Sequence, residues 1–264
     1  MCLIVFAWKA HPAYPLVLAA NRDEYFSRPT LPLDYWKDLP DVLGGRDVEK
    51  GGSWYATHMD GRWAAVTNFR DGTASRPTAP SRGALVRNYL ASATHARDYV
   101  SQISGSLAEY PGCNLLIGDD QNLYFVSNRS RGLHRAQAQL VSAGIHGLSN
   151  DSLDTPWPKV ERSKRRMERL LGSQPEQLSD ELFGLLADRS LADEGALPST
   201  GVPLEWEKKL SAPFIISDNY GTRASTVMLV GNDGDVSVQE RSFGSGGTEL
   251  TRRAFSFSLA AAAR

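Results

Sequence analysis

Cys2 is the residue of this chain whose type and position most clearly suit it to catalysis, because it directly follows the initiator Met. Aminopeptidases normally remove Met before a residue as small as Cys, which would leave Cys2 with a free α-amino group beside its thiol. An α-amine has an unperturbed pKa of about 7.7–8.0 and a Cys thiol about 8.5, so the amine can accept the thiol proton near neutral pH. Nucleophile and base would then share one residue, as in N-terminal threonine hydrolases. The competing interpretation is that Cys2 is a small apolar start to a strand.

A run of four polar residues at 21–24, Asn-Arg-Asp-Glu, follows the apolar run 16–20. If the apolar runs 2–8 and 16–20 pair as a hairpin, Cys2 lies near residues 21–23 at the far end of the second strand. An Arg beside a thiol favours the thiolate, and an Asp beside an α-ammonium would orient the amine. Alternatively, this run is a polar turn with an internal Arg–Asp pair of a kind common on surfaces.

The elements that must position these residues follow from hydrophobic patterning. The pattern predicts a hairpin over 2–20, a long loop over 25–50, and hairpins over 53–67, around Asp60-Gly61, and over 114–126. Helices are predicted over 81–90, 94–107, 157–171 and 178–191, and strands over 213–217, 226–230 and 236–238. This order predicts an α+β fold of two stacked antiparallel sheets covered by helices. No linker or repeat interrupts it, so we expect a single domain over residues 1–264.

Composition excludes several classes of protein. The 264 residues include 29 Lys and Arg against 30 Asp and Glu, a net charge of -1 that argues against a nucleic-acid partner. Two cysteines and five dispersed histidines lack zinc spacing, so we expect no metal and no cofactor. No apolar run reaches the roughly 20 residues of a membrane span. The few cysteines suit a reducing, cytoplasmic setting.

Motifs spread through residues 1–230 resemble those of the NRDE family, also called the transport and Golgi organisation protein 2 family. In chain order they are Met-Cys-x-x-x-Phe at the start, Ala-Ala-Asn-Arg-Asp-Glu at 19–24, Gly-Gly-Arg-Asp at 44–47, Ala-Ala-Val-Thr-Asn-Phe-Arg at 64–70, Gly-Leu-Ser-Asn at 147–150, Thr-Pro-Trp-Pro-Lys at 155–159 and Tyr-Gly-Thr-Arg-Ala-Ser-Thr at 220–226. The family looks like a branch of the N-terminal nucleophile hydrolases. The resemblance therefore implies a four-layer αββα sandwich of two stacked antiparallel sheets.

The resemblance also implies a set of site residues. Bile-salt hydrolases and penicillin V acylases in this superfamily use an N-terminal Cys, an Arg, an Asp, two Asn and a late Arg, and the similar positions here are Cys2, Arg22, Asp23, Asn68, Asn150 and Arg223. By this resemblance the Cys attacks an acyl carbon and the Asp orients the amine. The Asn residues supply oxyanion donors, and the Arg residues favour the thiolate. Taken singly, each Asn is equally typical of a turn or loop.

Two functions follow. The first is hydrolysis of an amide or thioester acyl bond in a small metabolite, with a small-molecule acyl substrate as the partner. The alternative is a non-catalytic protein on the same fold that binds or carries haem or lipid. Members of the resembled family are linked to haem homeostasis and lipid handling, and Cys2 would then be a ligand or a relic. A homo-oligomer is compatible with either function.

Overall fold

The computed structural model describes residues 2–73, 78–129 and 137–259. Contacts divide the chain into two compact units. Unit 1 comprises residues 1–27, 142–149 and 153–264, and unit 2 comprises residues 28–141 and 150–152. The single domain expected over residues 1–264 stays a prediction.

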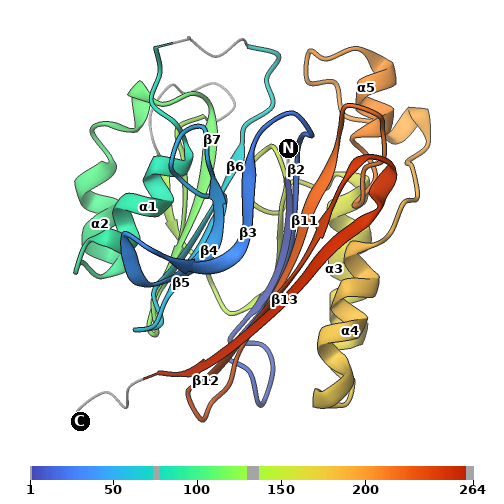
Figure 1. Cartoon of the computed structure of the whole chain (residues 1–264). Coiled ribbons are helices and arrows are strands. Elements are labelled where there is room, and N and C mark those ends of the chain that lie inside the picture. The colour runs from blue at the N-terminus through green and yellow to red at the C-terminus, as the bar shows by residue number, and fades with distance from the viewer. Residues whose placement is uncertain (1, 74–77, 130–136, 260–264) are drawn as a thin grey trace. The chain divides into compact units, whose positions relative to one another are not determined.

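Unit 1 contains an antiparallel sheet with strand order β10-β1-β2-β11-β12-β13. Figure 1 labels four of these strands, β2, β11, β12 and β13. Its strands are β1 (Cys2–Trp8), β2 (Leu16–Tyr25), β10 (Gly144–Leu148), β11 (Tyr220–Val230), β12 (Asp235–Phe243) and β13 (Glu249–Ser258). Its helices are α3 (Pro158–Leu170), α4 (Pro175–Leu186) and α5 (Leu204–Lys209), with short 3₁₀ turns at Glu194–Ala196 and Ser245–Gly247. The first hairpin is confirmed, and its register sets Cys2 directly opposite Arg22.

The helices of unit 1 cover one face of this sheet. Successive strand residues point to opposite faces, and the alternate residues Val5 and Ala7 of β1 face Val17 and Ala19 of β2 in one buried cluster. Apolar residues of α3 and α4 complete that cluster: Met167, Leu178, Leu182, Phe183, Leu185 and Leu186. Side chains of the same parity in β1 and β2 therefore point toward the helices.

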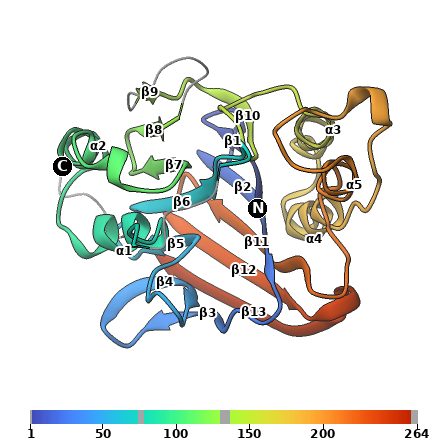
Figure 2. The same cartoon turned by 90° about the horizontal axis from the view of Figure 1, so that it is seen from above.

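Unit 2 contains a second antiparallel sheet with strand order β3-β4-β5-β6-β7-β8-β9. Its strands are β3 (Thr30–Trp36), β4 (Leu39–Asp47), β5 (Tyr55–His58), β6 (Trp63–Asn68), β7 (Cys113–Gly118), β8 (Leu123–Ser127) and β9 (Gln137–Leu140). Helices α1 (Gly83–Ala91) and α2 (Ala96–Ile103) lie beside this sheet (Figure 2). They share one apolar core with residues of β3 to β8. A 3₁₀ turn at Leu107–Glu109 follows α2. Each unit is thus an antiparallel sheet carrying helices, which confirms the predicted α+β class.

Two local predictions were wrong. The segment 25–50 is not a long loop, because it contains the paired strands β3 and β4. Residues 213–217 are not a strand. In that segment the Pro213 carbonyl accepts a hydrogen bond from the Asn21 side chain, and the Ile215 N–H donates to the Thr222 hydroxyl. Side chains of β2 and β11 therefore bind backbone groups of this segment that would pair with another strand in a sheet.

Among the described residues, every helix is too short or too polar to cross a membrane.

Candidate active site

Cys2 opens β1 between two neighbouring strands of unit 1. On one side its Cα pairs with Arg22 of β2. On the other side, the Ser149 hydroxyl just beyond β10 donates a 3.0 Å hydrogen bond to the Cys2 carbonyl. The residue is half-buried. The main chain of Cys2 is therefore fixed from both sides while its sulfur lies at the end of the strand.

The surroundings of Cys2 favour the protonated thiol. Burial raises its pKa, and the Asp23 carboxylate acts in the same direction. The Asp23 N–H and the Arg22 guanidinium oppose this and lower the pKa, but the balance stays above the usual value. A thiol in this state needs a base to become a nucleophile near neutral pH.

Asp23 is buried in β2, one residue beyond the partner of Cys2. Thr222 of β11 donates a 2.7 Å hydrogen bond from Oγ1 to Asp23 Oδ1. The hydroxyl of Tyr220 donates to the Asp23 carbonyl at 3.1 Å. Burial raises the pKa of Asp23, whereas Lys159, Thr222 and Arg22 lower it. These contacts hold the carboxyl group in one orientation.

Arg22 is also buried, with its side chain 5% exposed. Its Nη2 lies 3.9 Å from Glu24 Oε2. Because directly paired residues of antiparallel strands point to the same face, the guanidinium shares its sheet face with the Cys2 sulfur. The structure therefore brings together Cys2 and Arg22, with the Asp23 backbone beside them.

Arg223 occupies a bulge in β11. Thr222 pairs with Asp23 and Ala224 pairs with Arg22, so Arg223 is the extra residue between them. Its Nη1 donates to the backbone carbonyl of Tyr25 at 2.8 Å, just past the polar run of β2. Burial lowers its pKa, and so does the positive charge of Arg22. The structure thus places Arg223 near Arg22, with its guanidinium bound at the end of β2.

Asn68 and Asn150 lie together in unit 2. The Asn150 side chain is fully buried, and its Nδ2 donates a 2.9 Å hydrogen bond to the Asn68 carbonyl. The Arg70 N–H donates to the Asn150 carbonyl at 2.7 Å. This pair is thus built around the last residue of β6.

Two side chains beside Asp23 were missed as site residues: Thr222 and Lys159. Both stand within the quoted motifs, Tyr-Gly-Thr-Arg and Thr-Pro-Trp-Pro-Lys. Lys159 begins a basic helical segment, a pattern that predicts a solvent-exposed side chain. In the structure, however, Lys159 is only 2% exposed. The usable signal was its place on the apolar stripe of the helix.

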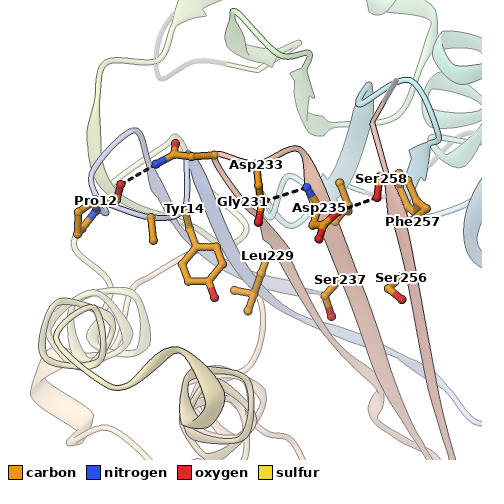
Figure 3. A pocket seen from close by; sticks show the side chains of 13 residues that line it. Pro12, Tyr14, Leu229, Gly231, Asp233, Asp235, Ser237, Ser256, Phe257 and Ser258 are labelled. Carbon is orange, nitrogen blue, oxygen red and sulfur yellow. Dashed lines mark hydrogen bonds between the residues drawn. The ribbon is translucent and has the colours of Figure 1, made fainter. Parts of the chain in front are cut away.

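A cavity of about 840 Å³ lies at the other end of the first hairpin (Figure 3). It is lined by the turn residues Pro12 to Tyr14 and by the ends of β11, β12 and β13. Because Cys2 begins β1 and this turn follows the end of β1, the cavity and Cys2 lie at opposite ends of the strand. Within the described ranges, no three His, Cys, Asp or Glu side chains are grouped to hold a metal ion.

The sequence comparison identifies the family. A family model for Transport and Golgi organisation 2 matches residues 1–245. The chain belongs to this family. The Transport and Golgi organization protein 2 homolog of Bos taurus is 33% identical over 92% of this chain and 93% of its own length. The homologue of Homo sapiens is 31% identical with the same coverage. The suspected relation to the Transport and Golgi organisation 2 family is therefore confirmed.

A solved structure shows the fold type of this chain. The Caenorhabditis elegans N-acylethanolamine-hydrolyzing acid amidase (NAAA) ortholog aligns with a TM-score of 0.50 and 10% sequence identity. The alignment covers 86% of this chain and 92% of that chain. This likeness confirms the predicted fold of the N-terminal nucleophile hydrolases.

Proposed function

We propose that this protein is an N-terminal cysteine hydrolase that cleaves an amide or thioester acyl bond of a small metabolite. The observation that carries the proposal is the strand register, which pairs Cys2 with Arg22 and sets Asp23 at the next position. The raised pKa of the thiol adds a reason for an adjacent base. Loss of Met1 would supply that base as the α-amine of Cys2.

The chemistry runs in two halves. In the first, the α-amine takes the thiol proton and the sulfur forms a bond to the acyl carbon. The bond to the leaving amine or thiol then breaks, and the leaving group takes the proton from the α-ammonium. In the second half the amine removes a proton from water, which attacks the thioester. The acid is released as the proton returns to sulfur.

The remaining residues have supporting roles in this proposal. Asp23 holds the α-ammonium, and the guanidinium groups of Arg22 and Arg223 favour the thiolate. Asn68 and Asn150 supply donors to the oxyanion, and removing one such donor typically costs about 2.7–4 kcal/mol of transition-state stabilisation. Both cysteines are free thiols, which suits the cytoplasmic location that we include in the proposal.

The deciding experiment combines intact mass with a matched pair of variants. The mass of the purified protein shows whether Met1 is absent. Turnover is then measured against a panel of acyl amides and acyl thioesters for the wild type, Cys2→Ser and Cys113→Ser. Cys113 is the control thiol, because burial in β7 raises its pKa to about 11 and keeps it unreactive.

The expected result is a protein without Met1 whose turnover is lost in Cys2→Ser and kept in Cys113→Ser. Retention of Met1 on an active protein would overturn the role of the amine. Equal turnover in wild type and Cys2→Ser would overturn the nucleophile. Stoichiometric titration of haem or a lipid by a protein without turnover would favour the carrier function instead.

A further inference from the structure

Helix α3 presents a buried lysine to the sheet of unit 1. The buried residues of α3 are Lys159, Val160, Ser163 and Met167, a stripe one helix face wide. Met167 belongs to the core that joins the helices to β1 and β2. Lys159 therefore points toward the sheet from the first turn of α3, and not toward solvent.

The strand register places Asp23 on the sheet face that α3 covers. Leu3 pairs with Asn21, so Leu3, Asn21 and Asp23 have the parity of the helix-facing residues. Leu3 packs against Trp157 and Val160, which flank Lys159 in the sequence. The Lys159 side chain therefore lies near the start of β1, on the same face of the sheet as the Asp23 side chain.

A lysine in this position is costly on general grounds. Lys is almost never fully buried unless it is paired, and a cation in the first turn of a helix meets the positive end of the helix dipole. A buried carboxylate nearby offsets both costs. In agreement, burial raises the pKa of Asp23 and the Lys159 charge lowers it.

The charged and titratable groups near this position come from the neighbouring strands of the sheet and from the elements packed on α3. Cys2 lies on β1, Arg22 and Asp23 on β2, and Tyr220 on β11. Beyond them, His146 of β10 and Lys164 of α3 both bind Asp154, and Asp188 after α4 binds Arg162 of α3. Asp154 and Asp188 thus have cationic or imidazole partners of their own. Asp23 is the carboxylate whose pKa the Lys159 charge lowers, and its own charge raises the pKa of the Cys2 thiol.

We infer that Lys159 is a positioning residue of the proposed hydrolase, whose ammonium keeps Asp23 ionised and promotes loss of a proton from the amine and thiol of Cys2. The inference rests on the proposed function. It adds a residue to which neither the motif resemblance nor the acylase comparison gives a role.

The effect of the Lys159 charge depends on how many protons the groups near it hold. Asp23, the α-amine and the thiol of processed Cys2 form one cluster. In the inactive form the cluster holds two protons, and in the reactive form it holds one, whichever atom carries it. A fixed positive charge stabilises the form with fewer protons. Removing the Lys159 charge therefore makes the activating deprotonation occur at higher pH.

The test reads the thiol directly and requires no substrate. The rate of Cys2 alkylation by iodoacetamide is followed by mass spectrometry from pH 5 to 10, and the buried thiol of Cys113 should stay unmodified. In Lys159→Met the midpoint should rise by about one pH unit, which makes alkylation at pH 7 about tenfold slower. Lys159→Arg keeps the charge and should keep the midpoint. Lys164→Met removes a charge from the same helix, away from Asp23, and should leave it unchanged.

A second variant covers the case in which Lys159→Met does not fold, as judged by thermal unfolding. Asp23→Asn removes the negative charge in a side chain of equal size and should shift the midpoint to lower pH. An unchanged midpoint in either folded variant overturns the role of Lys159. The failure of the proposed function has a different signature, because turnover would then survive Cys2→Ser whatever the alkylation profile.

Discussion

Thr222 Oγ1 donates a 2.7 Å hydrogen bond to Asp23 Oδ1 across the β2–β11 pair. The same hydroxyl accepts a 2.9 Å hydrogen bond from the backbone N–H of Ile215. One fully buried side chain therefore links the carboxylate to the segment that precedes β11. The bulge immediately after Thr222 allows this alignment, because it lets Thr222 pair with Asp23 while Ala224 pairs with Arg22.

Replacing Thr222 by Val should destabilise the protein and disturb the carboxylate. The isosteric change leaves the Ile215 N–H and one Asp23 oxygen without the hydroxyl. We expect a loss of about 2–4 kcal/mol in unfolding free energy. Urea denaturation measures it. Thr222→Ser keeps the hydroxyl and should lose about 1 kcal/mol; equal losses in both variants would show that the hydroxyl contributes little.

Replacing Asn150 by Ala should separate a catalytic amide from a structural one. The variant loses the 2.9 Å bond to the Asn68 carbonyl. If the amide also serves the oxyanion, kcat should fall about 10²–10³-fold. Asn114→Ala is the matched control, because Asn114 is also fully buried in unit 2 and donates 2.8 Å to the Asp151 carbonyl. Similar kcat values for the two folded variants would argue against an oxyanion role for Asn150.

Asp154 should give unit 1 a pH-dependent stability. Desolvation opposes its ionisation, but hydrogen bonds from His146, Lys164 and the Gly147 N–H lower its pKa to about 2. A carboxyl whose pKa is depressed by folding stabilises the protein above its unfolded pKa of about 3.9, and that stabilisation is lost as the pH falls toward 2.

The matching variant is Asp154→Asn, since Asn tolerates the positive φ of 59° at this position. The Asp154 side chain is 33% exposed, so solvent screening reduces the expected loss to about 1 kcal/mol at pH 7. Chemical denaturation of the wild type and Asp154→Asn from pH 7 to 2 measures the difference in their unfolding free energies. This gap should close below about pH 4. A gap that stays constant with pH would mean that packing, not charge, explains it.

Gly147→Ala should force α3 away from β10. A Cβ at Gly147 would stand 2.6 Å from Val160 Cγ1, one residue from Lys159. Such overpacking typically costs about 1–3 kcal/mol. At Gly105 nothing lies within 4 Å of the added Cβ. Gly105→Ala is thus the control, and thermal unfolding should show a decrease in Tm for the first variant alone.

Local patterns predicted the first hairpin well and the next two strands poorly. The apolar runs 2–8 and 16–20 read as paired strands because a turn-rich segment separates them. In contrast, Pro32 and Gly44 look like breakers. Pro32 is tolerated because β3 is an edge strand. Gly44 lies so close to β5 that a Cβ would meet Ala56 Cβ at 2.6 Å. Such close packing between strands depends on the tertiary structure and cannot be predicted from the local sequence.

The candidate site likewise combines features that the local sequence predicts with features that depend on tertiary packing. Register along one hairpin was enough to pair Cys2 with the polar run of β2. The bulge at Arg223 and the burial of Lys159 depend on how β11 and α3 meet β2 and β1. Residues 213–217 show this dependence on tertiary packing most plainly. Their apolar composition predicts a strand, but the side chains of Asn21 and Thr222 bind their backbone.

The position of Cys2 at the head of a paired strand has a practical consequence for recombinant work. An affinity tag or fusion partner placed ahead of residue 1 would convert the would-be base into an amide, which cannot take up a proton. Under the proposed mechanism, material prepared in that way would show no hydrolase turnover. Expression with the purification handle at the carboxyl end, or with a protease that releases cysteine as the first residue, avoids such a false negative.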